Sequence, residues 1–133
     1  MGIMKKKMNN KGFSLVELII VIAIMAVLIG VLAPQYIKFV AKSKVSTDIT
    51  NAEELANAIN VALADTDMAI SITSGTAFAA GAVVTTEGGA DKVKAPASKV
   101  DPARTWIVTY DTNGVSAITL GGKAIWPDAS AYN

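Results

Sequence analysis

The residues with the clearest chemical role lie near the start of the chain, where Lys11-Gly12-Phe13 precedes Glu17. Cleavage between Gly12 and Phe13 would leave a cationic amine on Phe13, four residues before the Glu17 carboxylate. On a helix, this carboxylate offsets the unfavourable meeting of the amine with the helix dipole. It can also pair with the amine of a neighbouring chain, because opposite charges attract strongly at low dielectric and each alone resists burial. If the chain is cut there, the burial of Glu17 becomes a device that sets the register between neighbouring subunits.

Glu17 directly precedes an apolar segment that is long enough to span the hydrocarbon core of a membrane. Residues 18–37 are 20 residues without a charge, which as a helix span about 30 Å, the thickness of a bilayer core. A carboxylate at bilayer depth costs roughly 2.5–3.5 kcal/mol and is functional by default. The lysines of the first 12 residues have no acidic neighbour there and favour a cytoplasmic N-terminus with the rest exported; they are Lys5, Lys6, Lys7 and Lys11.

Two simpler interpretations of this run stay open. A cleaved secretory signal would end best after Ala33, but Pro34 follows directly and the run is longer than a usual signal core. A plain membrane anchor explains the length and the lysines, but it has no use for Glu17.

The segment Lys-Gly-Phe-Ser-Leu-Val-Glu-Leu, residues 11–18, with the apolar run after it, resembles the N-terminus of type IV pilins and their pseudopilin relatives over about residues 5–40. The resemblance implies a prepilin whose basic leader, residues 1–12, is removed after Gly12 by prepilin peptidase, with N-methylation of Phe13. It assigns Glu17 to assembly and matches the family's helix proline with Pro34. It also implies a homopolymer of identical subunits, made first in the cytoplasmic membrane and then displayed as a filament at the cell surface. The further partners would be the pilus assembly machinery and its ATPase.

Apolar residues continue at helical spacing beyond the run, which predicts one helix from about Ser14 to Asp65. Residues 13–37 form its apolar half and residues 38–65 its amphipathic half. The expected buried stripe is Val45, Ile49, Ala52, Leu55, Ala56, Ile59 and Leu63, and the expected solvent face carries Lys42, Lys44, Asp48, Glu53 and Asn57. Gly30 and Pro34 weaken this helix, since Pro34 lacks an amide proton and crowds the Gly30 carbonyl. We expect an ordinary kink there, or a stretch over residues 26–34 that loses helical bonds in a filament.

The rest of the chain predicts a small antiparallel sheet packed on the amphipathic half, an α+β fold. Residues 66–104 are expected to be a variable loop region, and residues 73–90 within it hold one good strand candidate, at 82–86, before a Gly-Gly turn. Residues 105–133 are expected to hold a hairpin with a type I′ turn at Asn113-Gly114 and a third strand at 123–126. This register puts Ile107 and Thr109 on the apolar face with Ile118 and Leu120.

The composition argues against catalysis and metal binding. The chain has no cysteine and no histidine, which removes the commonest metal ligands and the commonest general base. No phosphate loop is present, and the pairs Glu53/Glu54 and Asp65/Asp67 are interpreted as a solvated helix face and a helix end. Without the leader, 8 basic residues face 11 acidic ones, which gives no electrostatic case for nucleic acid. We expect no enzyme and no cofactor.

The sequence therefore predicts a structural, major-pilin-like subunit of a type IV pilus. One alternative is a pseudopilin of a type II secretion or competence DNA-uptake machine, because the shared N-terminus does not separate the two. A second is a membrane-anchored module that displays the C-terminal sheet as a binding surface.

Overall fold

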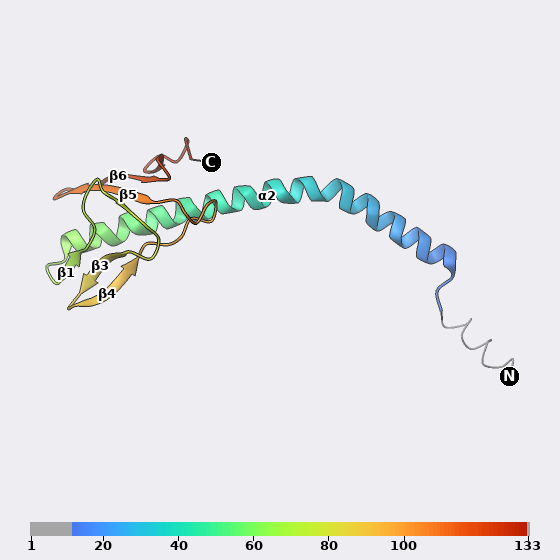
Figure 1. Cartoon of the computed structure of the whole chain (residues 1–133), viewed down its shortest axis with the longest axis horizontal. Helices are drawn as coiled ribbons and strands as arrows, with labels where there is room; N and C mark the ends of the chain where they lie inside the picture. The colour runs from blue at the N-terminus through green and yellow to red at the C-terminus, as the bar shows by residue number, and fades with distance from the viewer. Residues whose placement is uncertain (1–11, 133) are drawn as a thin grey trace. The chain divides into compact units, whose positions relative to one another are not determined.

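The computed structural model describes residues 12–132. The leader lysines lie outside the described residues. A single long helix, α2 (Leu15–Ala64), is followed by seven short strands, β1 to β7 (Figure 1). The chain divides into two compact units, Met1–Phe39 and Val40–Asn133, and both contain part of α2.

The α2 residues of the first unit are helical and uncovered. Every residue from Gly12 to Phe39 is exposed, although the segment is almost wholly apolar. Pro34 lies inside α2 without ending it. The helix was predicted to begin near Ser14 and to end near Asp65, and its observed bounds agree within one residue at each end.

In the second unit, one face of α2 packs into the core. The buried helix residues are Asp48, Ala52, Leu55, Ala56, Ile59 and Ala62, and Val45, Ile49 and Leu63 pack partly against them. The predicted stripe is therefore confirmed, with one correction. Asp48 was assigned to the solvent face, but it is fully buried. It precedes Ala52 by four residues and Leu55 by seven, so helical geometry places it in the middle of the stripe.

Two antiparallel sheets complete the second unit. The first sheet has the strand order β1-β3-β4 and is made of β1 (Met68–Ile70), β3 (Val83–Glu87) and β4 (Ala90–Lys94). The second sheet has the order β2-β5-β6-β7 and is made of β2 (Ala77–Phe78), β5 (Trp106–Asp111), β6 (Gly114–Leu120) and β7 (Lys123–Trp126). Strands β3 and β7 lie where the sequence predicted strands. The prediction of a single strand within residues 73–90 is wrong, because β2 also forms there, and β1 and β4 lie in the remainder of the region that was expected to be a loop. Their polar, small-residue sequences carry little strand signal, and pairing with distant segments decides their conformation.

A type I′ turn was predicted at Asn113-Gly114, but the turn of this type lies in another hairpin, between β3 and β4, at Gly88-Gly89. Glu87 pairs with Ala90, so Gly88 and Gly89 form a two-residue loop, and their φ angles of 59° and 84° fit a type I′ turn.

At the β5–β6 hairpin, by contrast, Asp111 pairs with Gly114 and the loop residues are Thr112 and Asn113. No described residue other than glycine has positive φ, which excludes type I′ here. The Asp111 carboxylate instead accepts the Asn113 amide proton at 2.7 Å, an Asx turn that starts the loop one residue earlier than predicted.

This earlier turn, with a register shift between Thr109 and Tyr110, moves the β5–β6 pairing by one residue. Val108 pairs with Ile118, and Trp106 with Leu120, and all four side chains are fully buried. The predicted apolar face, with Ile107 and Thr109 inward, is therefore wrong, because a one-residue slip exchanges the two faces of a strand.

The core joins the α2 stripe to both sheets, which confirms the α+β fold class. Its buried members outside α2 are Ile72, Val84, Ala95, Trp106, Val108, Ile118, Leu120, Ile125 and Tyr132. Phe78 is only partly buried and packs against this cluster. The indole N–H of Trp106 donates to the Pro96 carbonyl at 2.8 Å, so the largest core side chain has its polar atom satisfied.

Candidate functional site

The start of α2 carries the predicted maturation residues. Phe13 is 87% exposed, and Gly12 is exposed as well, so the peptide bond between them is accessible. The Ser14 hydroxyl accepts the Glu17 amide proton at 3.2 Å and so caps the helix, with Glu17 in its first turn. Ser14 and Glu17 have the Ser-x-x-Glu spacing of a capping box, and Glu17 lies in the first turn, where the helix dipole favours a negative charge.

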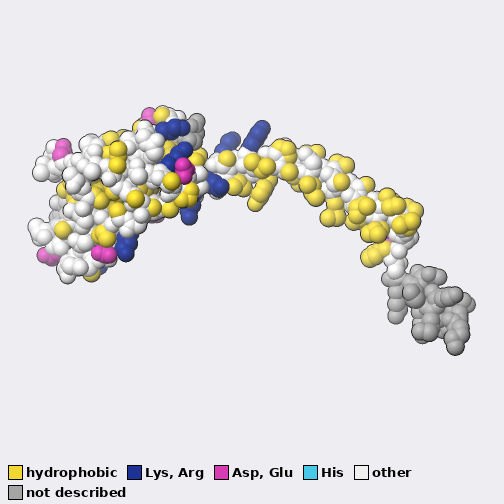
Figure 2. Space-filling view, in the orientation of Figure 1, with side chains coloured by type: hydrophobic (Ala, Val, Ile, Leu, Met, Phe, Trp, Pro, Cys, Tyr) yellow, Lys and Arg dark blue, Asp and Glu magenta, His cyan; other side chains and the backbone are white. Residues whose placement is uncertain are grey.

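The visible face of this segment is almost wholly apolar in Figure 2. The large hydrophobic side chains between Phe13 and Phe39 are all at least half exposed. Within the described residues, this is the one helix long and apolar enough to cross a membrane, by length and composition. Transfer of a large apolar side chain out of water gains roughly 1.5–3 kcal/mol. The segment therefore has a strong tendency to enter lipid or to pack against other apolar helices.

Gly30 and Pro34 lie in the middle of this apolar surface. Both are helical, and a Cβ built on Gly30 meets no atom within 4 Å apart from the helix's own neighbouring backbone. Loss of helical bonds over residues 26–34 in a filament stays a prediction.

A second polar site, absent from the sequence predictions, surrounds the buried Asp48 carboxylate. Its Oδ2 atom accepts a hydrogen bond from the Ser98 hydroxyl at 2.6 Å and another from the Tyr132 hydroxyl. The Lys99 amide donates to Oδ1 at 2.6 Å and the Val100 amide to Oδ2 at 3.4 Å. We call these five residues the Asp48 clamp, because α2 holds two distant segments of chain through one carboxylate.

The clamp keeps Asp48 ionised although water does not reach it. Burial alone raises the pKa of Asp48, but the hydrogen bonds from Ser98, Tyr132 and the two amides together outweigh burial and lower that pKa below its usual value. Burial, and the hydrogen bond to this carboxylate, raise the pKa of the Tyr132 phenol. The proton therefore stays on Tyr132. The Arg104 guanidinium lies 5.4 Å from the centre of the Tyr132 ring and adds a cation–π contact.

The signal for a buried Asp48 was present in the sequence, since the residue lies on the same helical row as Ala52, Leu55 and Ile59. Its partners were not predictable, because Ser98 and Tyr132 are 50 and 84 residues away along the chain. A buried carboxylate predicts that donors exist without saying where they are.

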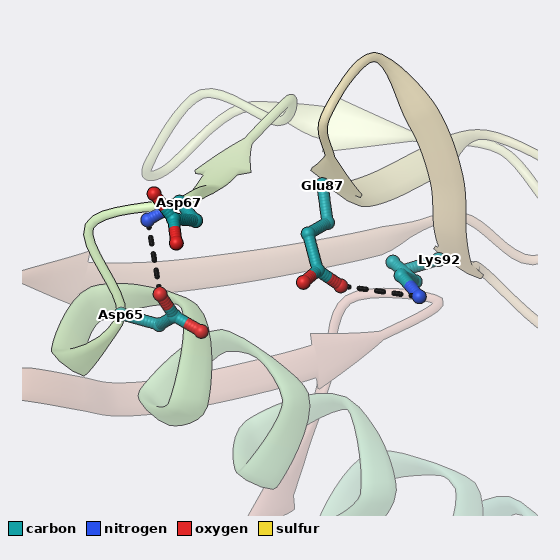
Figure 3. Close-up of polar contacts among 4 residues, drawn as sticks. All are labelled: Asp65, Asp67, Glu87 and Lys92. Carbon is teal, nitrogen blue, oxygen red and sulfur yellow. Dashed lines mark hydrogen bonds and ion pairs between the residues drawn. The ribbon is translucent and has the colours of Figure 1, made fainter.

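Two further pairs of charged residues, Asp65 with Asp67 and Glu87 with Lys92, have local structural roles. Asp65 follows the last residue of α2, and its carboxylate accepts the Asp67 amide proton at 2.9 Å (Figure 3). Glu87 on β3 pairs with Lys92 on β4 at 3.1 Å, with both side chains substantially exposed. Among residues 12–132, no group of three or more acidic side chains is arranged to hold a metal ion.

Comparison with known proteins identifies the N-terminal segment. The prokaryotic N-terminal methylation motif matches residues 7–33, a range that includes Gly12, Phe13 and Glu17. This segment is therefore similar to the N-terminal segment of prokaryotic proteins that carry this motif. The sites that the family resemblance implied for Gly12, Phe13 and Glu17 stay predictions.

Curated relatives support the assignment over part of the chain. It is 39% identical over 59 residues to the type IV major fimbrial protein FimA of Dichelobacter nodosus, covering 44% of this chain and 38% of the relative. It is 46% identical over 50 residues to the type IV major pilin protein PilA of Myxococcus xanthus, covering 38% and 23%. It is 39% identical over 71 residues to the prepilin peptidase-dependent protein A of Clostridium perfringens, covering 51% and 49%. The chain thus spans less than half the length of these relatives. No solved structure matches it significantly.

Proposed function

We propose that this protein is a structural, major-pilin-like subunit of a type IV pilus. Prepilin peptidase removes the leader after Gly12 and methylates the Phe13 amine. Before assembly, the subunit is held in the cytoplasmic membrane with its N-terminus on the cytoplasmic side. An assembly machinery with an ATPase then transfers it into a homopolymeric filament. The function is physical and not catalytic.

The observation that carries this proposal is a fully exposed apolar helix segment with one carboxylate in its first turn. Apolar helices can leave lipid for an equally apolar filament centre, where close packing supplies much of the association. In that surrounding, an unpaired Glu17 is costly, and the amine of a neighbouring Phe13 supplies the opposite charge.

A pseudopilin is the second candidate within the family. The relatives named above as major fimbrial and major pilin proteins favour a pilus subunit over it. Purified surface appendages decide between them: electron microscopy should show extended filaments, and mass spectrometry should show this chain as their bulk component. A trace component of a membrane complex would overturn the pilus assignment.

Maturation is tested by mass spectrometry of the mature protein. We expect a chain that begins at methylated Phe13. A chain that keeps its leader and an unmethylated Met1 would favour a membrane-anchored binding module instead.

The role of Glu17 is tested with three variants in the same cells. Glu17→Ala and Glu17→Gln should be processed yet fail to assemble, since both lack the charge that pairs with the amine. Ser14→Ala removes the helix cap at a cost of about 1 kcal/mol, but keeps the charge, and should still form filaments. Normal filaments from Glu17→Gln would overturn the role of the Glu17 charge in assembly.

A further inference from the structure

The exposed face of α2 in the second unit carries two opposite charges that form no ion pair with any other described residue. Lys42 and Glu53 are both exposed helix residues, and neither forms an ion pair among residues 12–132. Eleven residues separate them, which is about 16 Å along the axis and about 20° around it. They therefore lie on one side of the helix but too far apart to pair with each other.

The helix surface between these charges permits close approach. Ser46 and Thr50 lie there, exposed and small, and the Thr50 hydroxyl is already bonded to the Ser46 carbonyl at 3.1 Å. Figure 2 shows dark blue lysine side chains projecting from α2 where its apolar segment ends. We call the exposed row Lys42, Ser46, Thr50 and Glu53 the polar stripe.

We propose that the polar stripe is a contact between copies of this chain, in which Lys42 of one copy pairs with Glu53 of the next. Two parallel α2 helices displaced by about 16 Å bring these charges together, and the reach of both side chains tolerates several ångströms either way. Because both charges lie on one side of the helix, the two neighbours flank the polar stripe on its two edges, one reached by Lys42 and the other by Glu53, and the contact propagates along a series. The parallel direction rests on the proposed function, which places every apolar segment in the same surrounding.

The contact sets register more than it holds the copies together. An exposed pair of this kind contributes about 0.2–1 kcal/mol, whereas equal charges brought face to face oppose assembly. A displacement of zero would set Lys42 against Lys42 and Glu53 against Glu53. The stripe therefore favours the staggered arrangement over the unstaggered one.

Zero-length carbodiimide cross-linking of intact filaments tests the contact directly, because it forms an amide only between an amine and a carboxylate that touch. We expect a Lys42–Glu53 linked peptide by mass spectrometry and a ladder of multimers by electrophoresis. Lys42→Arg keeps the charge but cannot form the amide, so it should assemble and lose that link. Linked dimers without a ladder would mean an antiparallel pair and would overturn the proposal.

Charge reversal tests whether the pair affects assembly. Lys42→Glu and Glu53→Lys should each raise the subunit concentration needed for assembly by roughly 3- to 10-fold, and the double variant should restore it to within about twofold. Glu54→Lys, with the same charge change about 100° around the helix, is the matched control and should have little effect. Wild-type filaments without the Lys42–Glu53 link would overturn this contact alone, whereas a wild-type chain that never forms filaments would overturn the proposed function as well.

Discussion

Replacing Asp48 with asparagine should destabilise the second unit by about 3–5 kcal/mol. The side chain keeps its size but has one acceptor oxygen instead of two. In its better orientation, the amide nitrogen replaces Oδ1 and faces the Lys99 amide, which loses its acceptor at a cost of about 1–3 kcal/mol. The bonds from Ser98 and Tyr132 to the remaining oxygen lose their charge assistance, roughly 1 kcal/mol each.

The assay is thermal unfolding of the full chain in detergent, followed by the fluorescence of the buried Trp106. For a unit of this size, 1 kcal/mol corresponds to about 4–8 °C in Tm, so we expect Tm to fall by roughly 12–40 °C. Asp67→Asn is the matched control, because Asp67 is exposed and should stay within about 0.5 kcal/mol. Equal Tm values for Asp48→Asn and wild type would refute the clamp as a source of stability.

The pH dependence gives an independent check on the same reasoning. Because the pKa of Asp48 is lower in the folded than in the unfolded chain, its contribution is complete above the unfolded value of about 3.9. The contribution is lost as the pH falls through the folded pKa. The stability difference between wild type and Asp48→Asn should therefore be constant from pH 5 to 8 and shrink below about pH 4. A difference that grows on acidification would contradict the lowered pKa.

Two further substitutions test the packing, each with its own control. Gly121→Ala should destabilise by more than Gly122→Ala in chemical unfolding; both glycines have positive φ, but only at Gly121 would the added Cβ lie 2.7 Å from the Arg104 side chain. Equal losses would mean that Arg104 moves aside freely. Leu55→Ala should cost about 2–5 kcal/mol in the same assay, because Leu55 is 1% exposed in the core. Val61→Ala, on the exposed side of α2, should stay within about 0.5 kcal/mol, and a comparable loss there would place the core face incorrectly.

The long helix was predictable because its signal is local and repeated. Apolar residues recur at spacings of three and four over many turns, and this period fixes which side is buried regardless of what covers it. The same period also placed Asp48 in the buried row. Asp48 was assigned to the solvent face because of its polarity and not its position in the helical period, and for this reason the Asp48 clamp was not predicted.

The sheets were less predictable because their details depend on competition between short-range signals. Asn113-Gly114 is a strong type I′ signal, yet the Asp111 carboxylate stabilises a different loop by accepting the Asn113 amide proton. That single side-chain bond moves the register and exchanges the inward and outward faces of β5. Strands β1, β2 and β4 form through pairing with segments that no local pattern identifies.

The two parts of α2 differ in what covers their apolar side chains. From Asp48 onward, the helix buries its stripe against its own chain. Residues 12–39 bury nothing, although each large apolar side chain there would gain roughly 1.5–3 kcal/mol on leaving water. No rearrangement of Pro34 or Gly30 changes this balance, since a kink redirects a surface without covering it. Nothing among residues 12–132 covers this surface, and Glu17 restricts what can do so. Lipid alone leaves that carboxylate unpaired, whereas under the proposed function an identical processed chain would supply both the apolar surface and a positive charge.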